Sequence, residues 1–122
     1  MGRDVLLIED EPNIIEAIRF ILSRDGWSVR THSDGLTALD AVSDHMPDVV
    51  ILDVMLPGRS GFDILRDIRG ASNLNRTPVL MLTAKGQTKD REMAEQLGVS
   101  RFMSKPFSNA DVLDAVRELA EA

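Results

Sequence analysis

One stretch constrains the fold of this chain more than any other. It is the unbroken apolar run from Val49 to Leu52, which lies between Asp48 and Asp53. A short apolar run rich in β-branched residues is typical of a strand buried on both faces, as strands inside a parallel sheet are. Open α/β folds bind ligands at the carboxyl ends of such strands. The residue at that end is Asp53, so we expect it to lie at a functional site.

Apolar residues along the rest of the chain recur with spacings that alternate between strand and helix. We expect strands over residues 5–8, 27–31, 48–53, 78–83 and 99–104. We expect helices that start at Pro12, at Ser33–Gly35, at Gly61, at Thr88 and after Ser108 or Asn109. Strands alternating with helices imply right-handed crossovers, and therefore a parallel sheet with helices on both faces.

The strength of each apolar run predicts the place of its strand in the sheet. The runs over 5–8, 48–53 and 78–83 are strongly apolar and therefore central, whereas those over 27–31 and 99–104 are weaker and therefore peripheral. This pattern fits an α/β fold of the flavodoxin-like (βα)5 type, a three-layer sandwich with strand order 2-1-3-4-5. In that order the first and third strands are neighbours, so Glu9 and Asp10 would meet Asp53.

Two smaller expectations concern side chains. The apolar faces of the second and fourth helices include Leu36 and Met93, which we expect to face the core. Asp10 or Glu11, just before Pro12, is expected to cap the free amides of the first helix.

Composition excludes several classes of protein. The 122 residues suit a single domain, residues 1–122. A net charge of −6 argues against direct nucleic-acid binding, which normally needs a basic patch. We expect no membrane association, because every apolar run is far shorter than a membrane span, and no signal peptide. The lack of cysteine agrees with a cytoplasmic location.

Three carboxylates at the predicted rim, those of Glu9, Asp10 and Asp53, indicate a cation site. Converging carboxylates repel one another, and each would be protonated unless a cation holds the charge. Oxygen ligands without His or Cys suit Mg²⁺. We expect Asp10 and Asp53 to be direct ligands and Glu9 to act through a water molecule, with the backbone carbonyl of Met55 as a further ligand.

Thr83 ends the fourth predicted strand and Lys105 ends the fifth, so both face the same crevice. An ammonium group beside a carboxylate and Mg²⁺ forms a positive cradle for a phosphoryl group, and a hydroxyl adds a neutral donor. A carboxylate can itself attack phosphorus and form an aspartyl phosphate. Each residue alone has an ordinary structural interpretation, as a cap or a surface lysine. Their combination favours phosphoryl transfer to Asp53.

Together these motifs resemble the receiver domains of two-component response regulators, over essentially the whole chain. The matching residues follow four strands in order: Glu9-Asp10-Glu11-Pro12, Asp53 to Pro57 with Gly61, Thr83-Ala84, and Lys105-Pro106-Phe107. The resemblance implies that a sensor histidine kinase or a phosphotransfer protein donates a phosphoryl group to Asp53, with Mg²⁺ held by the acidic pair. It further implies that Lys105 pairs with the phosphoryl group, that Thr83 moves to hydrogen-bond it, and that Lys105-Pro106 is a cis peptide.

The resemblance also predicts how the signal leaves the domain. Phosphorylation would switch the surface formed by the fourth helix, the fifth strand and the fifth helix, to which an output partner of unknown identity binds. Such a domain is a signalling switch that assists its own phosphorylation and dephosphorylation rather than a dedicated enzyme.

Three positions depart from the family pattern. Phe102 replaces the usual switch Tyr, so it keeps the ring and loses the hydroxyl, and we expect the ring to turn into space that Thr83 vacates. A homodimer that forms on phosphorylation stays open as a partner state, although Arg101 stands where many DNA-binding members have an acid that pairs across the dimer interface, which weakens the case for it. Arg59 replaces an apolar residue in the loop after Asp53.

Three other functions are weighed against the switch. An aspartyl-phosphate hydrolase of the haloacid dehalogenase type would have a second Asp where Met55 stands. A dinucleotide-binding enzyme would have G-x-G-x-x-G in the first loop. A docking module without phosphorylation would not need the acidic pair, Thr83 and Lys105. The sequence identifies neither the kinase nor the output partner.

Overall fold

The computed structural model describes residues 3–84 and 88–121, and its five strands form one parallel sheet in the order β2-β1-β3-β4-β5. The strands are β1 (Asp4–Ile8), β2 (Ser28–His32), β3 (Val49–Asp53), β4 (Val79–Thr83) and β5 (Arg101–Ser104). The helices are α1 (Pro12–Arg24), α2 (Ala38–His45), α3 (Gly61–Gly70), α4 (Thr88–Gln96) and α5 (Asn109–Glu121), with a 3₁₀ turn η1 (Gly35–Thr37) before α2. The flavodoxin-like order is thus confirmed.

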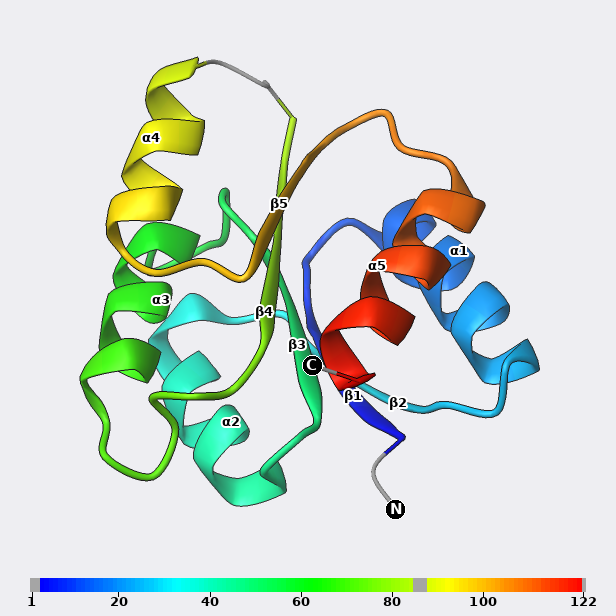
Figure 1. The fold of residues 1–122 in the computed structure, drawn as a ribbon, viewed down its shortest axis with the longest axis horizontal. Coiled ribbons are helices and arrows are strands. Elements are labelled where there is room, and N and C mark those ends of the chain that lie inside the picture. The colour runs from blue at the N-terminus through cyan, green and yellow to red at the C-terminus, as the bar shows by residue number, and fades with distance from the viewer. Residues whose placement is uncertain (1–2, 85–87, 122) are drawn as a thin grey trace.

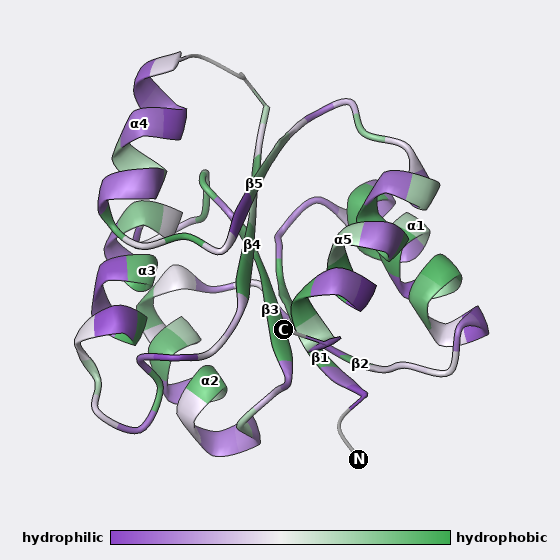
Figure 2. Ribbon diagram, in the orientation of Figure 1, coloured by the Kyte–Doolittle hydropathy of each residue, from purple (hydrophilic) through white to green (hydrophobic). Residues whose placement is uncertain are grey.

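The sheet lies between two layers of helices. Figure 1 shows α1 and α5 on one face of the sheet and α2, α3 and α4 on the other. Strand β3 and much of β4 are green in Figure 2, whereas the helices carry hydrophilic and hydrophobic residues in turn. All strand pairs are parallel, so every strand delivers its carboxyl end to the same rim.

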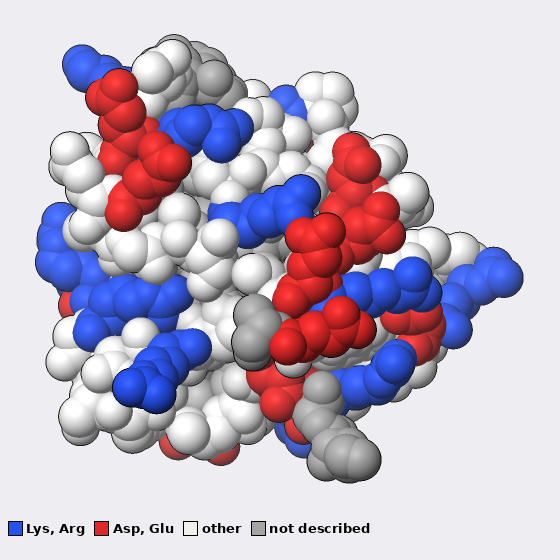
Figure 3. Space-filling view, in the orientation of Figure 1, with Lys and Arg blue, Asp and Glu red and all other residues white. Residues whose placement is uncertain are grey.

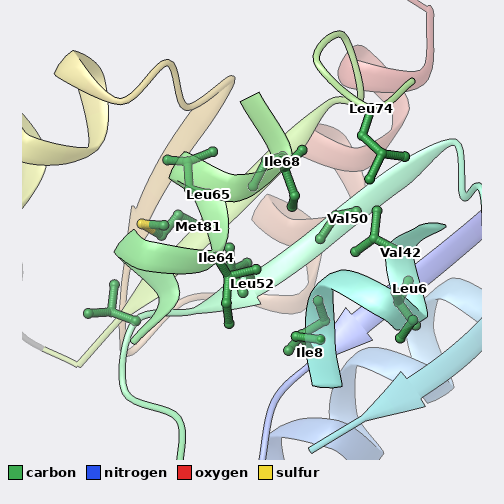
Figure 4. Close-up of a cluster of buried hydrophobic side chains, with 14 of the residues drawn as sticks. Leu6, Ile8, Val42, Val50, Leu52, Ile64, Leu65, Ile68, Leu74 and Met81 are labelled. Carbon is green, nitrogen blue, oxygen red and sulfur yellow. The ribbon is translucent and has the colours of Figure 1, made fainter. Parts of the chain in front are cut away.

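Strand β3 is buried over its whole length, as its composition predicts. Val50 and Leu52 pack into the cluster beneath α2, α3 and α4, part of which is drawn in Figure 4. Val49 and Ile51 point the other way, into the cluster beneath α1 and α5. Because successive side chains of a strand alternate between faces, one strand serves both halves of the core.

Two predicted core side chains are exposed instead. Leu36 is 70% exposed because residues 35–37 form a 3₁₀ turn, which moves its side chain off the apolar face of α2. Met93 is 47% exposed, whereas its neighbour Ala94 is fully buried. A polar helix such as α4 packs through a narrow stripe, and successive residues of a helix point about 100° apart. The predictions for Leu36 and Met93 were therefore wrong.

No helix within the described ranges 3–84 and 88–121 is long and apolar enough to cross a membrane.

Candidate functional site

Strand register brings four polar residues together at the carboxyl rim of the sheet. Ile8 of β1 lies beside Leu52 of β3, so the next residues along each strand, Glu9 and Asp53, are also adjacent. Thr83 at the end of β4 pairs with Ser104, the residue before Lys105. The backbone amide of Lys105 donates to the Thr83 carbonyl oxygen at 2.7 Å, which fastens β5 to β4 at this rim.

The carboxylates of Glu9, Asp10 and Asp53 converge as predicted. One oxygen from each lies within 4.8 Å of the others. Glu9 is fully buried and Asp53 is 3% exposed, whereas Asp10 faces solvent. Two buried carboxylates side by side are costly, because each loses its hydration and repels the other.

Lys105 bridges the two buried carboxylates. Its Nζ lies 3.3 Å from Glu9 Oε1 and 3.3 Å from Asp53 Oδ1. When all four groups are charged, three carboxylates and one ammonium leave the cluster with two uncompensated negative charges. The donors are all oxygen atoms, and a divalent hard cation would balance the excess, so the residues fit Mg²⁺.

Burial and charge shift the pKa values of this cluster. Burial raises the pKa of Glu9 above its usual 4.5, and the charge of Asp53 raises it further, against the opposing effect of Lys105. Burial by itself would lower the pKa of Lys105, but Asp53 and Glu9 outweigh it and raise the value. Lys105 is therefore held as a cation, and any added positive charge would favour the ionised form of Glu9.

Glu9 holds the loop before α1, and α1 begins without a side-chain cap at Glu11. Glu11 is the cap residue of α1, yet its side chain makes no cap hydrogen bond. The amides of Asp10 and Glu11 donate to Glu9 Oε2 at 3.2 Å each. The prediction that an Asp10 or Glu11 side chain caps the helix was wrong. Pro12 has no amide to cap, and the Glu11 backbone carbonyl accepts hydrogen bonds from the amides of Ile14 and Ile15 at 3.1 Å each. Asp10 is left free to face a ligand.

The loop after Asp53 is fixed by backbone contacts. The Val54 amide donates to the Leu82 carbonyl at 2.9 Å, and the Gly61 amide donates to the Val54 carbonyl at 2.8 Å. A Cβ atom on Gly61 would lie 2.3 Å from the Asp53 carbonyl oxygen, so only glycine fits at the start of α3. Met55 lies in this loop with an exposed side chain.

The remaining predicted site residues surround the cluster. Thr83 is buried at the end of β4, and Ala84 follows it at the surface. The Lys105-Pro106 peptide is cis. Phe102 is 8% exposed, with the Arg91 guanidinium 5.3 Å from its ring centre. The ring is already buried in the cluster beneath α2, α3 and α4.

The two unusual arginines make contacts within the chain. Arg101 of β5 pairs with Glu118 of α5, and Arg59 pairs with Asp67 of α3 at 2.6 Å. The pair with Glu118 occupies the Arg101 side chain within the chain.

Sequence reasoning missed one feature beside the cluster. A cleft of about 460 Å³ opens between α1 and the loop from β5 to α5, next to Lys105. Its apolar lining comes from Ile14, Ala17, Ala84, Pro106 and Phe107. The residues come from three separate segments, so no local pattern reveals the cleft. Phe107, a partly exposed aromatic beside the site, is the one signal that suggests it.

Comparisons with known proteins agree with this geometry. The family model described as the response regulator receiver domain matches residues 5–117. The receiver domain of a sensor histidine kinase from Pseudomonas aeruginosa PAO1, solved with a magnesium ion coordinated in its active-site cleft, is 30% identical, with full coverage of both chains and a TM-score of 0.90.

Two further solved structures are similar over the whole fold. A proposed response regulator from Chloroflexus aurantiacus J-10-fl is 26% identical, with full coverage of both chains and a TM-score of 0.94. A chemotaxis response regulator from Vibrio cholerae is 28% identical, covers 98% of this chain and 99% of its own, and has a TM-score of 0.90.

Proposed function

This chain belongs to the response regulator receiver domains of two-component signalling, and we propose that it accepts a phosphoryl group on Asp53. The proposed donor is a phosphohistidine of a sensor histidine kinase or a phosphotransfer protein. In this proposal, residues 1–122 form one receiver domain, which acts as a switch and assists its own phosphorylation. The observation that carries the proposal is the cluster of Glu9, Asp10 and Asp53 with Lys105 bridging its buried pair.

The same cluster supports Mg²⁺ as the cofactor. Asp10 and Asp53 would be direct ligands, the Met55 carbonyl a third protein ligand, and Glu9 a partner through water. When bound, Mg²⁺ would neutralise the excess negative charge and stabilise the charge that develops on the transferring group. An oxygen-only set with one exposed member, Asp10, also leaves room for the waters that Mg²⁺ usually keeps.

The chemical step follows from the position of Asp53. An Asp53 carboxylate oxygen attacks phosphorus and forms the new oxygen–phosphorus bond, while the phosphorus–nitrogen bond of the donor breaks and the imidazole leaves with its electron pair. Lys105, already within 3.3 Å of Asp53, would follow the negative charge onto the phosphoryl oxygens. We expect the Thr83 hydroxyl and the backbone of Ala84 to contact the same group.

The cleft beside Lys105 is the proposed approach for the donor protein. Its apolar lining adjoins the acidic cluster, so a partner that packs there would place a phosphohistidine near Asp53.

The output surface is the face of α4, β5 and α5. Figure 3 shows acidic side chains over α4 and over α5, with basic side chains between them. A groove of about 500 Å³ on this face contains Phe102 together with Arg91, Arg101, Asp111, Asp114 and Glu118. Rearrangement of α4 would uncover or bury the ring, and an output partner would read that change.

The proposal is tested with a small phosphodonor. The chain is incubated with Mg²⁺ and acetyl phosphate, and its intact mass is measured. We expect an acid-labile increase by one phosphoryl group that disappears in Asp53→Asn and persists in the matched control Asp48→Asn. The proposal fails if the parent gains no adduct, or if Asp53→Asn gains as much as the parent does. A chain of the unphosphorylated docking type would give the first of these results.

A further inference from the structure

Two loops that are distant in sequence interlock beside the candidate site. The Gly35 amide donates to the Pro57 carbonyl oxygen at 2.9 Å. A Cβ atom on Gly35 would lie 2.4 Å from the Arg59 carbonyl oxygen and 2.8 Å from the Arg59 amide nitrogen. All of these partners are backbone atoms, so no change of side-chain rotamer could make room. The backbone of the 57–59 loop therefore rests directly on Gly35.

Leu36, which follows Gly35, covers the 57–59 loop from another side. Gly58 has a φ of +85°, and a Cβ atom there would lie 2.7 Å from Leu36 Cγ. Asp34 Oδ1 accepts a hydrogen bond from the Leu36 amide at 2.9 Å, which fixes the turn that holds Leu36 in place. The exposure of Leu36 is thus explained, because its side chain packs on this loop and not on the core.

These contacts complete a set of ties along the loop that follows Asp53. Val54 is tied to β4 and to α3 through its amide and its carbonyl. Pro57 is tied to Gly35 through its carbonyl. Met55 lies between the two tied residues, so the position of its carbonyl oxygen depends on both.

We propose that Gly35 is a positioning residue for the metal site. By holding the 57–59 loop, it sets the place of the Met55 carbonyl oxygen, and through it the affinity for Mg²⁺. This inference rests on the proposed function, since the Met55 carbonyl is a proposed ligand. Groups that only orient metal ligands commonly change metal affinity by about 10-fold to 100-fold when they are altered.

The test compares two glycine-to-alanine substitutions. Gly35→Ala adds a methyl group that must displace the loop. Gly70→Ala adds the same group at the end of α3, where nothing lies within 4 Å of the new Cβ. The backbone carbonyl ¹³C shifts of residues 54–57 are recorded without metal, and Mg²⁺ is then titrated into each protein.

We expect Gly35→Ala to move the carbonyl shifts of residues 54–57 and to weaken Mg²⁺ binding about 10-fold or more. Raising the Mg²⁺ concentration should then restore phosphorylation by acetyl phosphate. Gly70→Ala should match the parent in every readout. A folded Gly35→Ala protein that binds Mg²⁺ as tightly as the parent would overturn the inference.

A second variant covers the case in which Gly35→Ala does not fold. Leu36→Ala removes the cover over Gly58 without adding atoms, and it should weaken Mg²⁺ binding in the same direction. Parental affinity in Leu36→Ala would then overturn the inference. A parent chain that binds no Mg²⁺ would overturn the proposed function together with this inference, whereas equal affinities in the parent and the variants would overturn the inference alone.

Discussion

Two aspartates in opposite circumstances bound the apolar run of β3, Asp48 just before the strand and Asp53 as its last residue. Asp48, at the amino end, is partly exposed, and its Oδ2 accepts a hydrogen bond from the Asp4 amide at 2.8 Å. Asp53, at the carboxyl end, is buried beside Glu9, with Lys105 as a shared counter-charge. A carboxylate with its own backbone donor holds two strands together. The Asp53 carboxylate shares the single ammonium of Lys105 with the Glu9 carboxylate, so it can bind a further cation favourably.

The same contrast appears in a second pair of carboxylates. Asp25 lies where α1 ends, before β2 begins, and accepts hydrogen bonds from Arg117 Nε at 3.0 Å and Trp27 Nε1 at 3.1 Å. The Arg117 hydrogen bonds lower the pKa of Asp25, with smaller help from Trp27 and from the charges of Arg117 and Arg3. Burial raises the pKa of Glu9. The negative charge of Asp25 is balanced by its hydrogen-bond partners, whereas the cluster around Glu9 keeps an excess of negative charge.

The largest expected effect comes from removing the shared cation. Lys105→Met leaves two buried carboxylates without a counter-charge, and we expect it to lower the free energy of unfolding by about 2–3 kcal/mol in the absence of metal. Mg²⁺ should restore part of that loss. Urea unfolding with and without Mg²⁺ measures both, and the exposed Lys89→Met is the matched control. An unchanged stability without metal would show that the site carries no excess charge.

A smaller effect of opposite sign is expected for Glu9→Gln. The amide removes a buried negative charge next to Asp53, so the metal-free protein should become more stable by about 1 kcal/mol while Mg²⁺ binding weakens. The control Glu16→Gln, on the exposed side of α1, should change neither quantity. A loss of both stability and Mg²⁺ binding in Glu9→Gln would mean that Glu9 mainly holds the loop before α1 through the amides of Asp10 and Glu11.

The smallest effect concerns Asp25 and depends on pH. Because its pKa is lowered in the folded protein, ionised Asp25 stabilises the fold above its ordinary pKa of 3.8. That contribution is lost as the pH falls through the lowered value. Asp25→Asn should therefore be less stable than the parent at neutral pH, and the difference should shrink on acidification below about pH 4. A difference that grows in acid would contradict the assignment.

The sequence predicted those features that depend on one segment at a time. The double burial of Val49 to Leu52 follows from their apolar side chains, and the strand order follows from the relative strength of such runs. Strand order then places Glu9 and Asp53 at one rim. The apolar pattern was enough, because all strands of a parallel sheet run the same way and their carboxyl ends therefore lie at one rim.

Other features depend on contacts between distant segments and could not be predicted. Gly35 and Leu36 appear in the sequence as the start of a helix, and only their contact with residues 57–59 gives them another role. Met93 and Ala94 are both apolar, and the packing of α4 decides which is buried. The expected side-chain cap of α1 is absent at Glu11, where the backbone carbonyl accepts from the amides of Ile14 and Ile15 instead.

The central claim is that the chain uses Asp53, and not the equivalent residue at the other end of β3, as its phosphoryl acceptor. After treatment with Mg²⁺ and acetyl phosphate, borohydride reduces an aspartyl phosphate to homoserine, and fragment sequencing by mass spectrometry locates it. We predict homoserine at position 53 and unmodified Asp48 in the same fragment. Homoserine at position 48, or none at position 53 in a chain that has gained the phosphoryl mass, would contradict the account.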